Sequence, residues 1–421
     1  MSDRPNVKIS VKLAVNQLQV GMFVAELDRD WLETPFPLQG FFIRSQSDID
    51  ALSDYCKHVY ILSTGKLNFS GKVDFESGVL IGRKPVQYPI SASFSDEFPA
   101  VHSLSGSIRE HVKSMLHRIR EGELVSVPEA RKLVEKSVES VIRHPDAITF
   151  MTRLRGLDDY TTEHCMNVCL LAVVFGRRLG LRKQQLINLG LCGLLHDAGK
   201  ARVPPEILNK PGRLDERERK IMMQHPALGK SLLEEKKDAY QEAVEVAFSH
   251  HERPDGKGYP RGLPAKDISL FTKIISIVDV YDAVTGDRVY AKGRPITDAM
   301  RIIYEGRGSQ FDADLALAFL QTIGVYPPGT LVELANGCLA VVADRSKGPR
   351  HLPTVLVLTN TRKQRVLPHS CHLSQSVDGG FDRGYLIRRA LPDGCYGIQL
   401  KTLVDQQLFS RETDNLYPPL D

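Results

Sequence analysis

Residues 249–262 read SHHERPDGKGYPRG and place two adjacent imidazoles, His250 and His251, directly before a loop rich in glycine and basic residues. Glycines allow backbone to approach a bulky ligand closely, and Arg253, Lys257 and Arg261 supply positive charge for an anion. A surface turn whose charges are merely solvated could have the same composition. The role of this stretch therefore has to be inferred from the segments on either side of it.

Those segments have helical periodicity. Apolar spacing predicts helices over residues 160–179, 183–198, 215–236, 239–251 and 270–285, and a further one from Thr297. Asp215 and Glu218 resemble a capping box at the start of the third helix. Strand patterns are almost absent from this part of the chain, so the sequence predicts an all-α domain here.

The length of the chain predicts several domains, because 421 residues exceed what one hydrophobic core usually holds. Residues 8–63 predict a small mixed α/β N-terminal module, with strands in QLQVGMFVAEL and HVYIL and a helix in SQSDIDALSDYC. Residues 64–105 predict a linker, 106–145 a helical connector and 146–325 the main helical domain.

The C-terminal part changes to the period-two pattern of strands after Tyr326. The dipeptide Asn336-Gly337 between TLVEL and CLAVVA predicts a hairpin, and TVLVLT predicts another strand. Residues 326–421 therefore predict a small β-rich module.

The composition limits the function classes. A net charge of +4 is too weak to indicate binding to a nucleic-acid polymer. We find neither a secretory signal nor an apolar run long enough to cross a bilayer, so we expect a cytoplasmic protein that does not bind membranes. The seven cysteines are odd in number and lack a CxxC pair, which indicates free thiols. The sequence does not indicate an oligomeric state.

Seven residues of the helical domain combine into a possible metal site. Asp279 interrupts the apolar run IISIVDVYDAV, where an unpaired carboxylate would be costly to bury. Taken singly, each histidine is more often structural, but all of them fall on or beside apolar stripes that face one interior. Imidazoles and carboxylates are the usual ligands of Fe, Mn and Zn, and seven groups suit two ions that share a bridging carboxylate. These residues are His164, His196, Asp197, His225, His250, His251 and Asp279.

Lys200 follows the His196-Asp197 pair on the same predicted helical face. Its ammonium could balance a substrate phosphate close to the metals. A surface lysine favoured by the helix dipole is the alternative interpretation.

These motifs together resemble one known family. HDAGK at 196–200, HP at 225–226, HHERPDGKGYP at 250–260 and DVYDAVTGDR at 279–288 resemble the HD-GYP domain, a subgroup of the HD metal-dependent phosphohydrolases, over about residues 145–325. Residues 15–43 are similar to an uncharacterised bacterial module that is often fused ahead of such domains. The resemblance implies an HD-type helical catalytic domain and a bacterial signalling enzyme that hydrolyses cyclic di-GMP to pGpG, with GMP as an alternative end product.

The resemblance also implies residue roles. His164, His196, Asp197 and Asp279 would hold one divalent ion, and Asp197 would bridge to a second ion held by His225, His250 and His251. Asp197 and Lys200 would be catalytic. The substrate contacts would come from Lys200, Arg253, Gly258, Tyr259, Pro260, Arg288 and Lys292.

Two departures from the family pattern matter. Members that bind a third ion carry Glu four residues before the first histidine, where this chain has Tyr160, so we expect two ions, with Fe or Mn favoured. The basic residue after Tyr290 stands one place later than usual, at Lys292, which leaves its phosphate contact open.

The expected reaction is in-line attack on phosphorus by a hydroxide that bridges the two ions. Two alternatives remain: an HD hydrolase for another nucleotide, such as a mixed cyclic dinucleotide, and an effector that binds cyclic di-GMP without cleaving it. The complete ligand set argues against the effector. The loop through Gly258-Tyr259-Pro260, called the GYP loop below, could also contact a diguanylate cyclase or another signalling protein.

Overall fold

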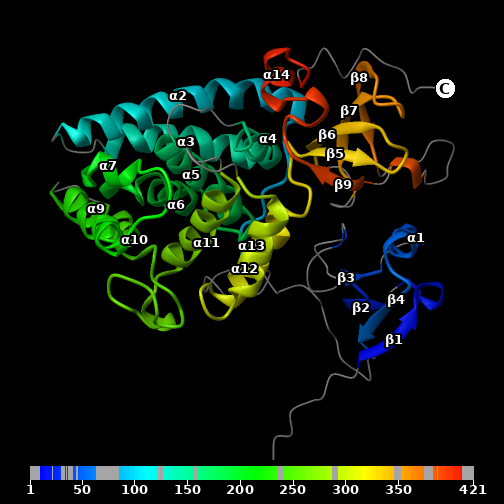
Figure 1. Cartoon of the computed structure of the whole chain (residues 1–421), viewed down its shortest axis with the longest axis horizontal. Helices are drawn as coiled ribbons and strands as arrows, with labels where there is room; N and C mark the ends of the chain where they lie inside the picture. Colours follow the sequence, from blue (N-terminus) through cyan, green and yellow to red (C-terminus); the bar gives the residue numbers. More distant parts are fainter. Residues whose placement is uncertain are drawn as a thin grey trace, which may run out of the picture.

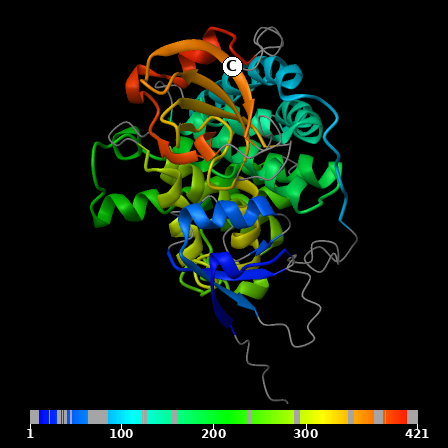
Figure 2. The same ribbon diagram turned by 90° about the vertical axis from the view of Figure 1, so that its right-hand side faces the viewer.

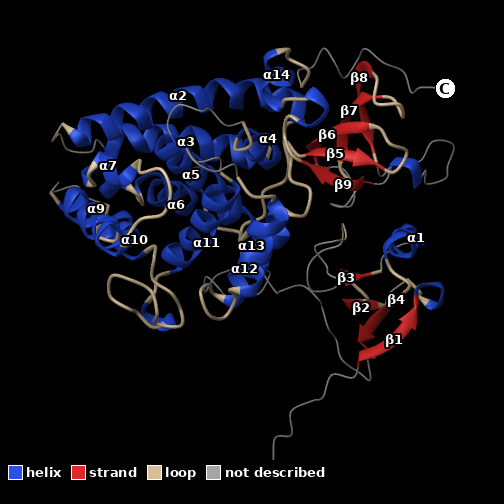
Figure 3. Ribbon diagram, viewed as in Figure 1, coloured by secondary structure: helices blue, strands red, loops and turns tan. Residues whose placement is uncertain are grey.

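The computed structural model describes residues 10–20, 22–29, 34, 36, 41–43, 46–62, 85–121, 123, 127–154, 160–235, 240–286, 293–345, 352–373, 383–385 and 387–409. Most of the helices form one large body, and the strands form two separate sheets (Figures 1 and 3). The helical domain with flanking N-terminal and C-terminal sheet regions confirms the predicted fold class at this level.

The main helices of the body pack around a shared core. They are α2 (Phe94–Arg120), α3 (Val127–Arg143), α4 (Pro145–Met151), α5 (Tyr160–Arg178), α6 (Lys183–Leu195), α9 (His225–Glu234), α10 (Gln241–Ser249), α11 (Leu270–Thr285), α12 (Ile296–Glu305) and α13 (Ala313–Ile323). Shorter elements between them are η3 (Ala198–Arg202), α7 (Pro205–Leu208), α8 (Glu216–Met222) and η4 (Ala265–Asp267).

Helices α5 and α6 approach closely because α6 carries a glycine at their contact. A Cβ on Gly193 would lie 2.9 Å from the Cα of Cys169, so a larger residue would push the helices apart. Almost every residue of α5 is buried, which agrees with its continuous apolar run. This close packing brings the start of α5 and the end of α6, which both carry histidines, to the same region.

One predicted helix is in fact two. Residues 215–236 divide into α8 and α9, and the capping box of Asp215 and Glu218 at the start of α8 is confirmed. The prediction of one continuous helix was wrong because Pro226 has no N–H to donate and its ring clashes with the preceding turn. Helix α9 therefore begins afresh at His225, which fixes that imidazole at a helix start.

Helix α2 begins at Phe94, within the segment expected to be a linker, and Ser93 caps it by accepting from the Asp96 N–H at 3.1 Å. The expectation of an irregular chain up to residue 105 was wrong because Pro99 and several serines obscure an apolar helical stripe. Phe94, Phe98 and Val101 form that stripe and are buried in the shared core.

The N-terminal module is a four-stranded sheet in the order β1-β4-β2-β3, with its own apolar core. Its elements are β1 (Ser10–Ala14), η1 (Val15–Gln17), β2 (Phe23–Leu27), β3 (Phe41–Phe42), α1 (Gln46–Tyr55) and β4 (His58–Leu62). This confirms the predicted strands and helix of a mixed α/β module. Figures 1 and 2 show it at the same end of the molecule as the C-terminal sheet, and the Tyr55 hydroxyl donates to the Ile387 carbonyl at 2.6 Å.

The C-terminal sheet has five antiparallel strands in the order β8-β7-β6-β5-β9. They are β5 (Leu331–Leu334), β6 (Leu339–Asp344), β7 (Thr354–Thr359), β8 (Arg365–His372) and β9 (Ile387–Leu391), followed by α14 (Leu400–Asp405), with short helices η6 (Arg383–Tyr385) and η7 (Cys395–Gly397). The predicted β5–β6 hairpin is confirmed. Gly337 adopts a φ of 91° at its turn, which glycine tolerates without strain.

One face of this sheet shares the core of the helical body. Val341 and Leu356 belong to the same buried cluster as the helices, and the Phe409 ring lies 4.7 Å from that of Phe150. The β-rich segment also has a buried cluster of its own, which includes Val332, Val342 and Val357, so it packs on the helices with one face and forms a separate small core with the other.

Two further expectations concern the chain as a whole. The seven cysteines are free thiols, as predicted. Among the helices that the structure describes, none combines the length and the apolar character needed to cross a membrane.

Candidate metal centre

All seven predicted metal ligands converge on one buried region. Their donor atoms form three overlapping groups, each within 4.8 Å: His164, His196 and Asp279; His196, Asp197 and His250; and His225, His250 and His251. We call the first group the aspartate-containing cluster and the last the three-histidine cluster. The side chains come from α5, the end of α6, the residue before η3, α9, the end of α10 and α11.

The turn after α6 brings the two clusters together. His196 ends α6 and Asp197 precedes η3. A Cβ on Gly199 would lie 2.0 Å from the His225 carbonyl oxygen, so only glycine lets η3 pack against the start of α9. This explains why a glycine follows the His-Asp pair in HDAGK.

Asp197 lies between the two clusters. Its Oδ2 is 3.3 Å from His196 Nε2 and 3.6 Å from His164 Nε2. Its Oδ1 is 3.4 Å from His225 Nε2 and 3.6 Å from His250 Nε2. One carboxylate oxygen thus faces each cluster, which is the arrangement that a shared, bridging ligand requires.

Backbone carbonyls orient three of the imidazoles. The Nδ1 atoms of His196, His225 and His250 lie 2.7, 2.7 and 3.0 Å from the carbonyl oxygens of Gly193, Met222 and Ala247. Because a carbonyl oxygen only accepts, each Nδ1 carries the hydrogen and each Nε2 presents its lone pair to the centre.

This arrangement leaves donor atoms that suit a cation. His225 Nε2 and His250 Nε2 lie 3.2 Å apart with their lone pairs facing one another. His196 Nε2 and Asp197 Oδ1 are buried, and neither has a hydrogen-bond partner among the residues that the structure describes. Buried polar atoms normally have partners, so the residues present fit divalent cations.

Two groups at the centre have the charge states that metal binding requires. Burial alone would raise the pKa of Asp197, but the Lys200 ammonium and the nearby imidazoles hold it well below its usual range. Burial lowers the pKa of His225 to about 3, so this imidazole is neutral near pH 7. An ionised carboxylate and a neutral imidazole are the forms that bind metals.

Asp282 supports the centre and was not among the predicted residues. Asp282 Oδ2 accepts from His164 Nδ1 at 2.8 Å, and its Oδ1 accepts from the Asn167 amide at 3.0 Å. Asp282 follows Asp279 by three residues in the same apolar run, and Asn167 follows His164 by three. A second carboxylate on the same buried helix face was the available signal.

The GYP loop lies against the three-histidine cluster. The Tyr259 ring stacks on the His251 imidazole, with centroids 4.7 Å apart. A Cβ on Gly258 would lie 2.4 Å from the backbone nitrogen of Arg253, so the loop requires glycine there. The buried Glu252 carboxylate accepts from the N–H groups of Arg261 at 2.7 Å and Leu263 at 2.9 Å, which ties the loop down.

The basic residues expected at the substrate differ in their surroundings. Lys200 pairs with Asp197 at the centre. Arg253 instead pairs with Asp255 at 2.6 Å, and Arg261 pairs with Glu245, so these two charges are already compensated. Pro260 is exposed next to Tyr259 and follows a cis peptide bond. Arg288 and Lys292 lie outside the described residues.

Tyr160 occupies the position at which three-ion members of the family carry Glu. Its ring stacks on the His164 imidazole, with centroids 5.6 Å apart and planes 7° apart. An aromatic ring thus covers this side of the aspartate-containing cluster.

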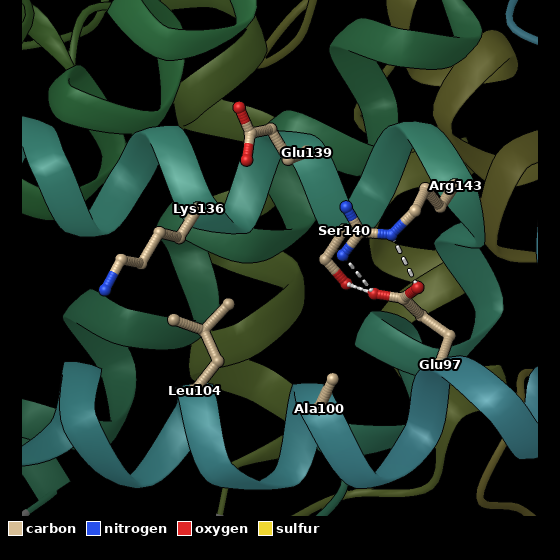
Figure 4. Close-up of a pocket in the computed structure, with 7 residues that line it drawn as sticks. All are labelled: Glu97, Ala100, Leu104, Lys136, Glu139, Ser140 and Arg143. Atoms are coloured by element: carbon tan, nitrogen blue, oxygen red, sulfur yellow. Dashed lines mark hydrogen bonds and ion pairs between the residues drawn. The ribbon is translucent and has the colours of Figure 1, made fainter.

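A separate pocket of about 210 Å³ lies between α2 and α3 (Figure 4). The buried Glu97 carboxylate at its edge accepts from Arg143 at 2.7 and 2.8 Å and from Ser140 at 2.6 Å. None of the predicted ligands lines this pocket. These contacts join two helices and indicate a structural role.

Imidazoles and carboxylates gathered from separate helices, with a His-Asp pair at the centre, define an HD-type domain. A family model described as HD domain matches residues 140–315, and one described as a domain of unknown function (DUF3391) matches residues 10–130. The chain is 35% identical over 364 residues to the cyclic di-GMP phosphodiesterase PA4108 of Pseudomonas aeruginosa, covering 85% of this chain and 87% of that protein.

Two further relatives match part of the chain. A 3'3'-cGAMP-specific phosphodiesterase of Vibrio cholerae is 34% identical, covering 40% of this chain and 36% of that protein. A cyclic di-GMP phosphodiesterase response regulator of Xanthomonas campestris is 31% identical, covering 52% and 54%. The chain belongs to the HD-GYP family of HD-domain proteins.

Proposed function

We propose that this chain is a metal-dependent phosphodiesterase that hydrolyses cyclic di-GMP to pGpG, with further cleavage to GMP as a second step. The position of Asp197, with one carboxylate oxygen toward each cluster, is the observation that carries the proposal. The name of the Pseudomonas relative, which aligns with most of this chain, supports cyclic di-GMP as the substrate.

The seven ligands would hold two divalent ions. His164, His196 and Asp279 would bind one, the three-histidine cluster would bind the other, and Asp197 would bridge them. Five imidazoles with two carboxylates favour Fe or Mn. Bound ions would supply Lewis-acid stabilisation of the phosphate and a water of lowered pKa.

The protein's own groups orient the substrate. The Lys200 ammonium contacts Asp197, and its side chain is 21% exposed, so it can meet a phosphate that enters from solvent. Burial tends to lower the pKa of Lys200, but Asp197 and Asp279 raise it above its usual value, which keeps the ammonium charged. Tyr259 and Gly258 would line the side of the substrate site that lies next to His251.

Two other functions are less well supported. The relative named for 3'3'-cGAMP aligns over a smaller share of the chain than the relative named for cyclic di-GMP. An effector without activity would be expected to lose ligands, whereas all seven are present and converge.

The exposed Lys257 and Pro260 of the GYP loop are the positions that a signalling protein such as a diguanylate cyclase would contact.

A turnover assay tests this function. The full chain would be purified without oxygen, loaded with Mn²⁺ or Fe²⁺, and given cyclic di-GMP, 3'3'-cGAMP and pGpG, with products separated by chromatography. We expect cyclic di-GMP to be consumed fastest and a chelator to stop the reaction. Absence of cyclic di-GMP turnover by the metal-loaded protein, with tight binding retained, would instead support the effector.

A further inference from the structure

The two clusters that share Asp197 differ in charge. The aspartate-containing cluster includes Asp279, whose Oδ1 lies 3.0 Å from His164 Nε2 and 3.9 Å from His196 Nε2. Among the described residues, the three-histidine cluster has no carboxylate other than Asp197 within this donor set. A cation in the first cluster therefore meets one more negative charge, in a buried place where water screens charges weakly.

Asp282 increases the difference. Its carboxylate is 1% exposed and accepts from His164 Nδ1 at 2.8 Å. By contrast, neutral backbone carbonyls hold the Nδ1 atoms of His225 and His250. A carboxylate partner makes an imidazole a more basic metal ligand and fixes its ring.

The Lys200 ammonium opposes this effect in part. It contacts Asp197 Oδ2, the oxygen on the side of the aspartate-containing cluster. One ammonium, partly exposed to solvent, opposes two carboxylates, Asp279 and Asp282, that lie outside the donor set of the three-histidine cluster, although the charge of Asp279 also acts on His251. The aspartate-containing cluster thus keeps the larger negative charge.

Resting on the function proposed above, we propose that the two metal positions are unequal. The aspartate-containing cluster binds its divalent cation first and more tightly, and Asp282 is the positioning residue that supports this tight position through His164. The three-histidine cluster binds the second, exchangeable cation. Activity then follows occupancy of the second cluster, so the free concentration of divalent metal regulates the enzyme.

A titration of the metal-free full chain with Mn²⁺ tests this inference, with calorimetry for affinity and electron paramagnetic resonance for occupancy. We expect a tight and a weak equivalent in the wild type. Asp282→Asn keeps the shape but removes the charge, and it should weaken the tight equivalent by about 10- to 100-fold. His251→Asn should remove the weak equivalent and leave the tight one.

Two further variants make the assignment specific. Asn167→Ala removes the amide that fixes Asp282 and should weaken the tight equivalent in the same direction, which keeps the test valid if Asp282→Asn does not fold. Asp298→Asn removes a carboxylate of α12 that pairs with Arg294, and both Mn²⁺ affinities should remain unchanged.

Two binding steps alone would not show that the positions differ, because two neighbouring cations repel each other and would bind in two steps even at identical positions. The test is therefore which of the two Mn²⁺ affinities each variant weakens. If Asp282→Asn left the tight affinity unchanged, or if His251→Asn weakened the first equivalent as strongly as the second, the inference would be overturned. Cyclic di-GMP turnover at saturating Mn²⁺ is a separate readout. Its absence would reject the proposed function without affecting the order of metal binding.

Discussion

Arg345 and Asp146, which are 199 residues apart in sequence, form a buried ion pair between the end of β6 and α4. The Arg345 Nη2 donates to Asp146 Oδ1 at 2.6 Å, and the Arg345 backbone N–H donates to Asp146 Oδ2 at 2.7 Å. This pair connects the C-terminal sheet to the helix that precedes the helices with the candidate metal ligands.

Replacing Asp146 by Asn should therefore destabilise the whole helical body. The change leaves the Arg345 guanidinium buried without its counter-charge, which costs about 3–5 kcal/mol of unfolding free energy. Chemical denaturation of the full chain measures it. Asp298→Asn, which breaks an exposed pair, should cost less than about 1 kcal/mol, and equal losses in the two variants would show that the buried pair is not special.

Tyr259 should contribute through its ring. Tyr259→Ala removes the stacking on His251, which is worth about 0.5–1.5 kcal/mol, so kcat/KM for cyclic di-GMP should fall roughly twofold to tenfold. Tyr259→Phe retains the ring and should retain the activity. A loss in the Phe variant as large as in the Ala variant would assign the effect to the hydroxyl instead.

Lys200 should act on the phosphate and not on the metals. Lys200→Met keeps the length of the side chain but removes the charge, and kcat should fall by about 100- to 1,000-fold, the usual effect of losing one charge-stabilising donor. Metal content, measured by mass spectrometry, should stay at the wild-type value. Loss of metal in this variant would make Lys200 a structural residue of the centre.

His111 on α2 should make stability depend on pH. Burial lowers the pKa of His111 below its ordinary value of 6.5. His111 therefore binds a proton at a higher pH in the unfolded chain than in the folded chain. The folded state keeps its full stability above about pH 6.5, and its free energy of unfolding decreases as the pH falls from there toward the folded-state pKa of His111. His111→Gln should show a smaller fall in Tm between pH 7.5 and 5.5. Identical pH profiles would show that His111 does not titrate in this range.

The helical domain was predictable because its apolar spacing is strong, and the convergence of the seven candidate ligands was predictable because five histidines and two aspartates share that apolar face. The break before His225 was missed because the apolar spacing continues across Pro226. The role of Asp282 was not visible, since only the packing of α5 on α11 places it at His164 Nδ1. The pairing of Arg253 with Asp255 likewise depends on how the loop folds.

The bridging position of Asp197 is the central claim, and the metal content of the Asp197→Ala variant tests it most directly. Elemental analysis of the full chain, equilibrated with saturating Mn²⁺ without oxygen, should give two bound divalent ions in the wild type and neither in the variant, with cyclic di-GMP turnover lost as well. A variant that kept two ions and full activity would contradict the account.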